Sequence, residues 1–238
     1  MTVRPWRVLP LRTGGAQTLL DEGLELFDAL DDMGPTLRWY RADTSAIVLG
    51  RGQRTLRLVA GPDPVAVRAS GGGAVWLSPD VLSLDVLVPA AHPWYTDQLG
   101  DLFMHVGRVW ARALRGVGVD VLTVHDGPAE ARRRGSAREQ LAAAVCYATR
   151  GRGEVLWQGR KLVGLAQRRR RHGAMVQCGL LRRWDPAPLL SRLGADRCDD
   201  EIAGAAVGLA DILPDPPADD PIMRAVLDAI VARPDARV

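Results

Sequence analysis

The sequence predicts an α+β fold in which helices pack against a mixed or antiparallel sheet. Segments typical of strands alternate with helices of different lengths, without the regular repeat of βαβ units. The composition is that of a globular protein, since 47% of the 238 residues are apolar and 25% are charged. A chain of this length can bury a full core, and we expect a single domain over residues 1–238.

Spacing of apolar residues and turn residues gives the predicted elements in chain order. Apolar side chains three or four residues apart indicate helices, runs of β-branched and apolar residues indicate strands, and glycine or proline marks the ends. The predicted elements are a helix over 17–30, strands over 36–40, 46–49, 64–68 and 81–88, a helix over 95–114, strands over 119–124, 154–157, 161–166 and 174–181, and helices over 188–193 and 221–231.

The basic residues are unusual because Lys161 is the only lysine among 31 basic side chains. A composition this rich in arginine suggests that position 161 needs a compact ammonium that a guanidinium cannot replace. The net charge of +3 is too small to predict a nucleic-acid partner. Two basic runs, at 132–134 and 168–171, are either solvated faces or contacts to phosphate or an acidic partner.

Neither a membrane segment nor a metal site is expected. No apolar run approaches the ~18 residues of a membrane span, and the N-terminus does not have the pattern of a signal peptide, so we expect a cytoplasmic protein. The cysteines, Cys146, Cys178 and Cys198, are widely spaced without a C-x-x-C pair, and they are expected to be free thiols.

Two motifs carry the chemistry. Residues 68–75 read RASGGGAV directly after a predicted strand, and three glycines allow a backbone to approach a ligand closely. Residues 159–169 read GRKLVGLAQRR and place Lys161 on a hairpin, where it can hold a carboxylate or phosphate or stabilise an oxyanion. Each motif alone is also compatible with a plain structural role, a flexible turn in one case and an exposed strand lysine in the other.

Together the motifs resemble the lipoate–protein ligase and octanoyltransferase family, within the biotin and lipoate ligase superfamily. Residues 37–40 (LRWY) with 48–53 (VLGRGQ) are similar to its opening strand pair, and residues 172–181 (HGAMVQCGLL) are similar to its closing strand. The resemblance covers about residues 6–195, which leaves 196–238 as a C-terminal extension. It implies attachment of an acyl group to a lysine of lipoyl carrier domains.

The resemblance also implies the site residues. The predicted substrate-binding residues are Arg68, Ser70, Gly71, Gly72 and Gly73 of the first motif and Gly164 and Ala166 of the second. Lys161 is expected to contact the acyl carbonyl or an adenylate phosphate. Cys146 lies fifteen residues before Lys161 and resembles the nucleophile of one octanoyltransferase branch, because a thiolate attacks a thioester well. The alternatives are that Cys146 is a small buried residue, or that Cys178 is the nucleophile.

The leading hypothesis is therefore transfer of an octanoyl or lipoyl group from acyl carrier protein, through a Cys146 thioester and without a cofactor. A second hypothesis is an ATP- and Mg²⁺-dependent lipoate–protein ligase with a partner subunit, because about 40 residues after Leu193 are too few for an accessory domain. A third is a non-catalytic relative that binds acyl groups or carrier domains. The stretch 76–83 (WLSPDVLS) lacks the His and Asn typical of the ligases and keeps this third hypothesis open.

Overall fold

A mixed seven-stranded sheet forms the centre of the computed structural model, which describes residues 4–130, 135–195 and 197–232. Only its first two strands are parallel; the other neighbours run antiparallel. The strands lie in the order β1 (Arg7–Gly14), β2 (Thr36–Ala42), β6 (Val81–Pro89), β10 (Gly173–Leu181), β9 (Arg160–Arg170), β8 (Val155–Trp157) and β7 (Leu122–Val124). The arrangement confirms the predicted α+β class with a mixed sheet.

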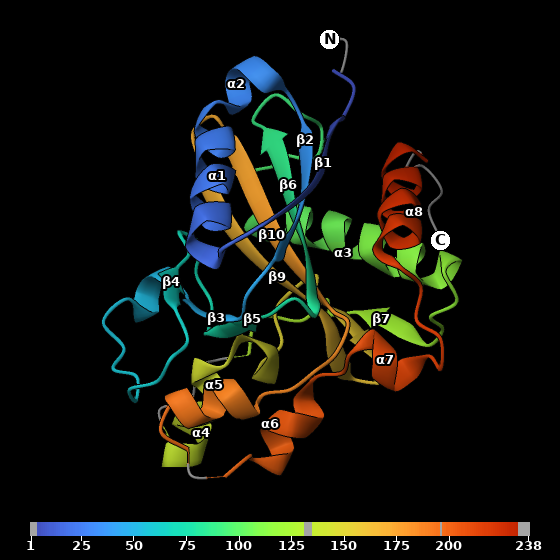
Figure 1. The fold of residues 1–238 in the computed structure, drawn as a ribbon. Coiled ribbons are helices and arrows are strands. Elements are labelled where there is room, and N and C mark those ends of the chain that lie inside the picture. The colour runs from blue at the N-terminus through green and yellow to red at the C-terminus, as the bar shows by residue number, and fades with distance from the viewer. Residues whose placement is uncertain (1–3, 131–134, 196, 233–238) are drawn as a thin grey trace.

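Helices cover both faces of this sheet (Figure 1). On one face, α3 (Leu99–Gly116) and α8 (Asp219–Val231) share the largest apolar core with β2, β6 and β10. There the ring of Trp110 meets that of Trp39, with centroids 5.7 Å apart. On the other face, Phe27 at the end of α1 (Ala16–Asp28) packs against Met175 of β10. Because side chains alternate along a strand, odd-numbered residues of β6 and β10 face α1 and even-numbered residues face α3.

A second, three-stranded sheet lies beside the N-terminal half of α1. Its order is β4 (Val65–Val67), β3 (Ala46–Leu49) and β5 (Val75–Leu77), with β3 and β4 parallel. Val48 and Leu77 of this sheet share a small core with Leu20 of α1 and Val81 of β6. This core leaves space between the two sheets, and the motif at 68–75 connects β4 to β5 across it.

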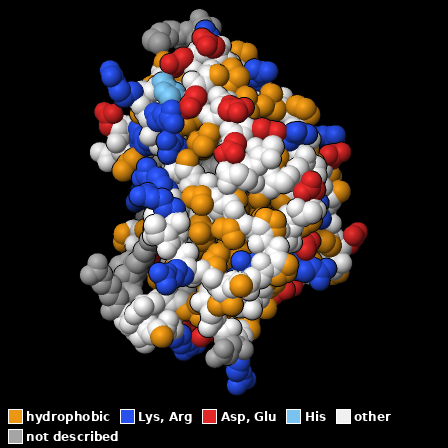
Figure 2. Space-filling view, turned by 60° about the vertical axis from the view of Figure 1, so that its left-hand side comes forward, with side chains coloured by type: hydrophobic (Ala, Val, Ile, Leu, Met, Phe, Trp, Pro, Cys, Tyr) orange, Lys and Arg blue, Asp and Glu red, His pale blue; other side chains and the backbone are white. Residues whose placement is uncertain are grey.

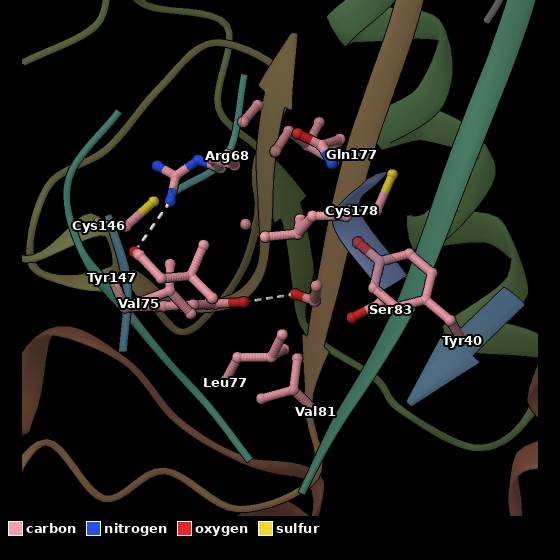
Figure 3. Close-up of a pocket in the computed structure, with 16 residues that line it drawn as sticks. Tyr40, Arg68, Val75, Leu77, Val81, Ser83, Cys146, Tyr147, Gln177 and Cys178 are labelled. Atoms are coloured by element: carbon pink, nitrogen blue, oxygen red, sulfur yellow. Dashed lines mark hydrogen bonds between the residues drawn. The ribbon is translucent and has the colours of Figure 1, made fainter. Parts of the chain in front are cut away.

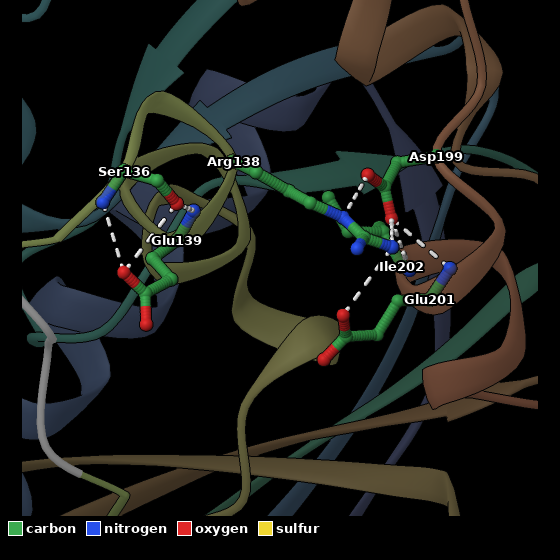
Figure 4. Close-up of polar contacts among 6 residues, drawn as sticks. All are labelled: Ser136, Arg138, Glu139, Asp199, Glu201 and Ile202. Carbon is green, nitrogen blue, oxygen red and sulfur yellow. Dashed lines mark hydrogen bonds and ion pairs between the residues drawn. The ribbon is translucent and has the colours of Figure 1, made fainter.

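Short helices complete the described fold. They are α2 (Leu30–Met33), η1 (Arg51–Gln53), α4 (Ala137–Ala144), η2 (Cys146–Ala148), α5 (Ala187–Arg192), α6 (Asp200–Ala205) and α7 (Leu209–Ile212). Two of them, α4 and α6, contact η2, the segment that contains Cys146. The helix α4 starts with a capping box, in which the Ser136 hydroxyl accepts from the backbone of Glu139 and the Glu139 carboxylate accepts from the backbone of Ser136 (Figure 4).

An ion pair ties the start of α4 to that of α6. The guanidinium of Arg138 lies 2.6 Å from the carboxylate of Asp199, which also caps α6 by accepting from the backbone of Glu201 and Ile202 (Figure 4). Because the Arg138 side chain is exposed, its ion pair with Asp199 contributes little to the free energy of unfolding. It nevertheless fixes the direction of α4, which leads directly into η2.

The predicted helices and strands are all present, with shifted ends, while several elements were not predicted. The missed elements are β1, β5, η1, η2, α2, α4, α6 and α7. β1 is an edge strand whose side chains are mostly exposed, so it lacks an apolar alternation. The strands at 36–40 and 46–49 do not pair, because β2 belongs to the large sheet and β3 to the small one. The basic run at 132–134 lies outside the described residues. No helix within the described ranges is long and apolar enough to cross a bilayer.

We expect Gly107→Ala to lower the free energy of unfolding by about 1–3 kcal/mol, because overpacking at a closed contact forces the backbone to shift. A Cβ at position 107 of α3 would overlap the carbonyl oxygen of Gly153 in the turn before β8. The matched control is Gly116→Ala at the end of the same helix, where a Cβ meets nothing within 4 Å. Urea unfolding measures both variants. Equal stability of the two would show that α3 does not pack closely on that turn.

Candidate functional site

A pocket lies between the two sheets and α1, with an empty volume of about 520 Å³ that includes the open space at its mouth (Figure 3). Its apolar wall consists of Leu20, Val48, Val75, Leu77 and Val81. Cys146 and Arg68 lie at one end, and Tyr40 and Ser83 lie at the other (Figure 3). The pocket therefore has an apolar middle with a thiol at one end, which suits an acyl chain bound at its carbonyl carbon.

Cys146 is held by the end of the glycine motif. Its backbone N–H donates to the carbonyl of Ala74 at 2.8 Å, and the N–H of Ala74 donates to the carbonyl of Ala144 at 2.6 Å. These bonds place the two segments side by side as a short parallel bridge. The Cys146 side chain is half-buried. Its thiol is thus fixed at the pocket while it stays accessible to a second reactant.

Arg68 braces the glycine loop from inside. Its guanidinium donates to the carbonyls of Gly71 at 2.8 Å and Gly73 at 2.6 Å, and its side chain is almost fully buried. Gly72 has a φ of +99°, where an L-residue is strained, and a Cβ there would lie 2.7 Å from Arg68 Nη2. The loop bends tightly around the guanidinium because these positions are glycine.

The hydroxyl of Ser70 links this loop to the large sheet. It donates to the side-chain carbonyl of Gln177 on β10 at 2.6 Å, and both residues are buried. Gln177 lines the pocket. The Ser70–Gln177 hydrogen bond therefore fixes the position of the loop relative to β10.

Lys161 lies directly behind Cys146 and is 2% exposed. Its ammonium is 2.6 Å from the carboxylate of Glu154 and donates to the backbone carbonyl of Cys146 at 2.7 Å. The ring of Tyr147 lies 5.6 Å from the same nitrogen, at cation–π distance. Lys161 does not itself line the pocket. The Lys161 charge is therefore held against the backbone of Cys146, the residue that carries the thiol.

Glu154, the partner of Lys161, was not identified from the sequence. It is 3% exposed, and its carboxylate accepts from the backbone N–H groups of Gly151 at 2.6 Å and Leu165 at 3.3 Å. These bonds satisfy a buried carboxylate in addition to the ion pair. The signal for it was a single acidic residue at the start of a predicted apolar strand, seven residues before Lys161.

Tyr147 fills the space that the second motif leaves. Its hydroxyl donates to the carbonyl of Gly179 at 2.7 Å, and burial raises the pKa of this phenol well above its usual range. A Cβ at Gly164 would lie 3.2 Å from the Tyr147 ring. Gly164 therefore makes room for an aromatic side chain that forms part of the pocket wall.

Cys178 borders the pocket on β10, but its side chain packs in the core beneath α3 (Figure 3). It is an even-numbered residue of β10 and faces α3, whereas its neighbour Gln177 faces the pocket. Burial raises the pKa of the Cys178 thiol far above its usual range, so the thiolate is disfavoured. The geometry therefore favours Cys146 over Cys178 as a nucleophile.

Charged residues are buried next to the polar end of the pocket. Arg38 pairs with Asp85 at 3.0 Å and with Glu22 at 2.9 Å, and its guanidinium lies 4.7 Å from the centre of the Tyr40 ring. Burial raises the pKa of Asp85 to about 6, although the Arg38 charge acts in the opposite direction. These contacts hold Tyr40 in place at the end of the pocket.

The structure brings together most of the residues singled out in the sequence. Residues that border the pocket are Arg68, Cys146, Gly164, Ala166 and Cys178, and residues that contact this lining are Ser70, Gly71, Gly72, Gly73 and Lys161. Gly71 and Gly72 are exposed at the loop tip. Sequence reasoning missed Glu154 and the polar side chains of Tyr40 and Ser83. Within the described part of the chain, no group of three or more His, Cys, Asp or Glu residues could hold a metal ion.

Comparison with known proteins places this chain in a family. The model of the lipoyl protein ligase A/B catalytic domain matches residues 12–230. Octanoyltransferase LipM from Kyrpidia tusciae is 27% identical over 99% of this chain and 89% of its own length. Octanoyltransferase LipM from an Exiguobacterium species is 31% identical over 75% of this chain and 66% of its own length.

Solved structures share the fold at low identity. A lipoate-protein ligase A bound with ATP superposes with a TM-score of 0.68 at 17% identity, covering 95% of this chain and 84% of the other. A biotin protein ligase from Aquifex aeolicus gives a TM-score of 0.51 at 13% identity, covering 94% and 68%. At these identities the likeness establishes the fold alone. Because the family model spans nearly the whole chain, the protein belongs to the family of lipoyl protein ligase A/B catalytic domains.

Proposed function

We propose that the protein transfers an octanoyl group from an acyl carrier protein to a lysine of lipoyl carrier domains, through a thioester on Cys146. The observation that carries this proposal is the half-buried thiol of Cys146 at one end of an apolar pocket, with the Lys161 ammonium on its own carbonyl. The octanoyltransferase names of the relatives support the reaction class.

The reaction has two balanced steps. In the first, the Cys146 thiolate attacks the carbonyl carbon of the donor thioester, a new C–S bond forms, and the donor thiolate leaves with a proton from solvent. In the second, the ε-amine of the acceptor lysine attacks the Cys146 thioester, and an amide forms. The sulfur of Cys146 leaves and takes up the proton that the amine loses.

Lys161 would contribute in two ways. An ammonium has three N–H donors, and within the described residues Glu154 and the Cys146 carbonyl account for two of them. We assign the third to the oxyanion that forms in each step, together with backbone N–H groups of the glycine loop. For this contact the ammonium, which lies behind Cys146 and outside the pocket lining, must move toward the sulfur. The contact to the carbonyl also fixes the backbone of Cys146, which orients the sulfur.

Transfer between thioester and amide needs neither ATP nor a metal, because the donor thioester supplies the energy. An ATP-dependent ligase would instead activate a free acid. The discriminating experiment mixes the protein with octanoyl-loaded acyl carrier protein and records the intact mass without ATP. An octanoyl adduct on Cys146 supports the transferase. Modification of a lipoyl domain only with free acid, ATP and Mg²⁺ would favour the ligase.

We expect Cys146→Ser to abolish the octanoyl adduct and to lower kcat/KM on the order of 10³-fold, about 4 kcal/mol of barrier. A serine hydroxyl is far harder to ionise at neutral pH than a thiol. Peptide mapping after iodoacetamide treatment should show that the acyl donor protects Cys146 from alkylation.

The controls for this prediction are the other two cysteines. Cys198 is exposed and gives background labelling, so the mapping is best done in Cys198→Ser. Partial desolvation and nearby aspartates raise the pKa of the Cys198 thiol, which slows its labelling. Cys178→Ser should keep most of the activity. Retention of full transferase activity by Cys146→Ser would refute the thioester intermediate.

We expect Lys161→Arg to lower kcat/KM by about a hundredfold, the typical effect of losing one oxyanion donor. The site holds a compact ammonium between a carboxylate and a carbonyl at 2.6 and 2.7 Å, and a planar guanidinium is wider. Steady-state kinetics and a thermal unfolding curve separate loss of catalysis from loss of fold. A folded variant that retains more than about a tenth of wild-type activity, about 1.4 kcal/mol, would remove Lys161 from the chemistry.

Adjacent glycines give a matched pair for the acyl pocket. We expect Gly72→Ala to weaken octanoyl binding at least about tenfold, because the residue has a positive φ and its Cβ would push against Arg68 and approach Cys146 Sγ to 3.9 Å. Gly71→Ala should bind as wild type does, since nothing lies within 4 Å of its Cβ. Calorimetry with an octanoyl thioether analogue measures both. Equal affinities would separate the loop from the acyl site.

A further inference from the structure

Arg51 and Arg168 flank the glycine loop from two different elements. The backbone N–H of Arg51, in η1, donates to the carbonyl of Ser70 at 2.9 Å. The Arg168 guanidinium, from β9, donates to the carbonyl of the preceding residue, Ala69, at 3.0 Å. The backbone of Arg51 and the side chain of Arg168 are thus anchored to adjacent residues of the loop, Ser70 and Ala69.

Three arginines, Arg51, Arg168 and Arg170, lie here around one acid, Asp28. Within the described residues neither Arg51 nor Arg168 forms an ion pair, while Arg170 nearby pairs with Asp28. Burial lowers the pKa of Arg168, the charges of Arg170 and Arg51 lower it further, and the Asp28 carboxylate acts in the opposite direction. Figure 2 shows blue side chains in a run along one edge of the molecule, beginning beside a histidine. Like charges that repel one another at a partly buried position indicate a site for an anion.

Arg168 also has a polar atom that the protein leaves unused. Its Nε is buried and has no hydrogen-bond partner among the described residues. Native structures satisfy most buried donors, and an exception calls for a specific explanation such as an ion. The Nε atoms of Arg41 and Arg160 are likewise buried without a partner in the described part of the chain. Because Nε of Arg168 is enclosed, a phosphate would contact the Nη groups of Arg168, of which Nη1 also donates to the carbonyl of Ala69.

The position of Arg168 relative to the pocket fits a substrate with an extended arm. Gly164, Ala166 and Arg168 follow one another on the same face of β9. Gly164 lies against Tyr147, beside Cys146, and Ala166 lines the pocket, whereas Arg168 lies just beyond it. Four residues of strand correspond to about 13 Å. A group bound at Arg168 therefore lies about 13 Å along β9 from Gly164, so a substrate must carry an extended arm to reach both Arg168 and the thiol.

We propose that Arg51 and Arg168 form an anion site that binds the phosphate of the pantetheine arm on which the acyl donor is delivered. This inference rests on the proposed transferase function and adds a second contact point to it. The arm joins the acyl thioester to its carrier protein and carries its phosphate at the far end. With the acyl chain in the pocket, the phosphate reaches the rim where the two guanidinium groups lie.

The same chemistry has a second source, the phosphates of ATP or of an acyl-adenylate. The two sources predict that activity depends on the two arginines with different substrates. A carrier-arm site acts without nucleotide and distinguishes donors with and without the phosphate. A nucleotide site acts only when free acid and ATP are supplied.

The test compares octanoyl-4′-phosphopantetheine with octanoyl-pantetheine, which differ only in the phosphate. We expect the wild-type protein to use the phosphorylated donor with at least about tenfold higher kcat/KM. In Arg51→Gln/Arg168→Gln this ratio should fall to about one, chiefly through KM of the phosphorylated donor, while kcat/KM for octanoyl-pantetheine stays unchanged. Arg168→Lys should keep part of the preference, because the positive charge remains.

Two controls isolate the charge effect from damage to the loop. Arg112→Gln removes an exposed charge from α3, on the opposite face of the sheet, and should keep the wild-type ratio. Arg51→Gln alone leaves the contact of Arg168 to Ala69 in place and should lower the ratio without changing the melting temperature.

The outcomes separate this inference from the proposed function. Equal use of both donors by the wild-type protein would overturn the anion site and leave the transferase proposal standing. If neither donor acylates Cys146, the transferase proposal itself fails. Dependence on Arg51 and Arg168 that is seen only in the reaction with octanoate, ATP and Mg²⁺ would assign the arginines to a nucleotide and overturn the proposal.

Discussion

The buried ion pair of Lys161 and Glu154 is the interaction on which the site depends. Removing an ammonium and a carboxylate from water costs several kcal/mol each, and their attraction compensates only if the remaining donors and acceptors are satisfied. Here the Glu154 carboxylate also takes two backbone N–H groups, and the Lys161 ammonium also takes the Cys146 carbonyl. The pair therefore locks the β8–β9 hairpin to η2, and the position of the thiol follows from the register of that hairpin.

In the glycine loop the buried cation is Arg68, which donates to backbone carbonyls, whereas Lys161 pairs with a carboxylate. Arg68 lines the pocket, and its guanidinium donates to three carbonyls, those of Val48, Gly71 and Gly73. A guanidinium has five N–H donors in a rigid fork, so it can hold a tight loop that has no regular hydrogen bonding of its own. Lys161 and the loop-flanking arginines Arg51 and Arg168 are further cations close to the pocket.

Much of this fold could be predicted from the sequence, since the apolar periodicity of α1, α3 and β6 depends on residues close in the chain. The pairing could not. β2 and β3 are separated by a short turn, but their partners lie far away in sequence, and nothing local assigns them to different sheets. The site shows the same limit. The spacing of Cys146 and Lys161 marked both residues, whereas Glu154 became visible only when its distance to the ammonium was known.

Strand alternation decides which cysteine meets the pocket. On β10, Gln177 and Gly179 face the α1 side, while Cys178 between them lies in the core under α3. A slip of one residue in the pairing of β10 would exchange these faces. Nine paired positions with β6 and eight with β9 fix the register on both sides, and apolar burial beneath α3 would be lost by any slip. The sheet thus turns the Cys178 side chain into the core, whereas η2, held by the end of the glycine motif, presents Cys146 at the pocket.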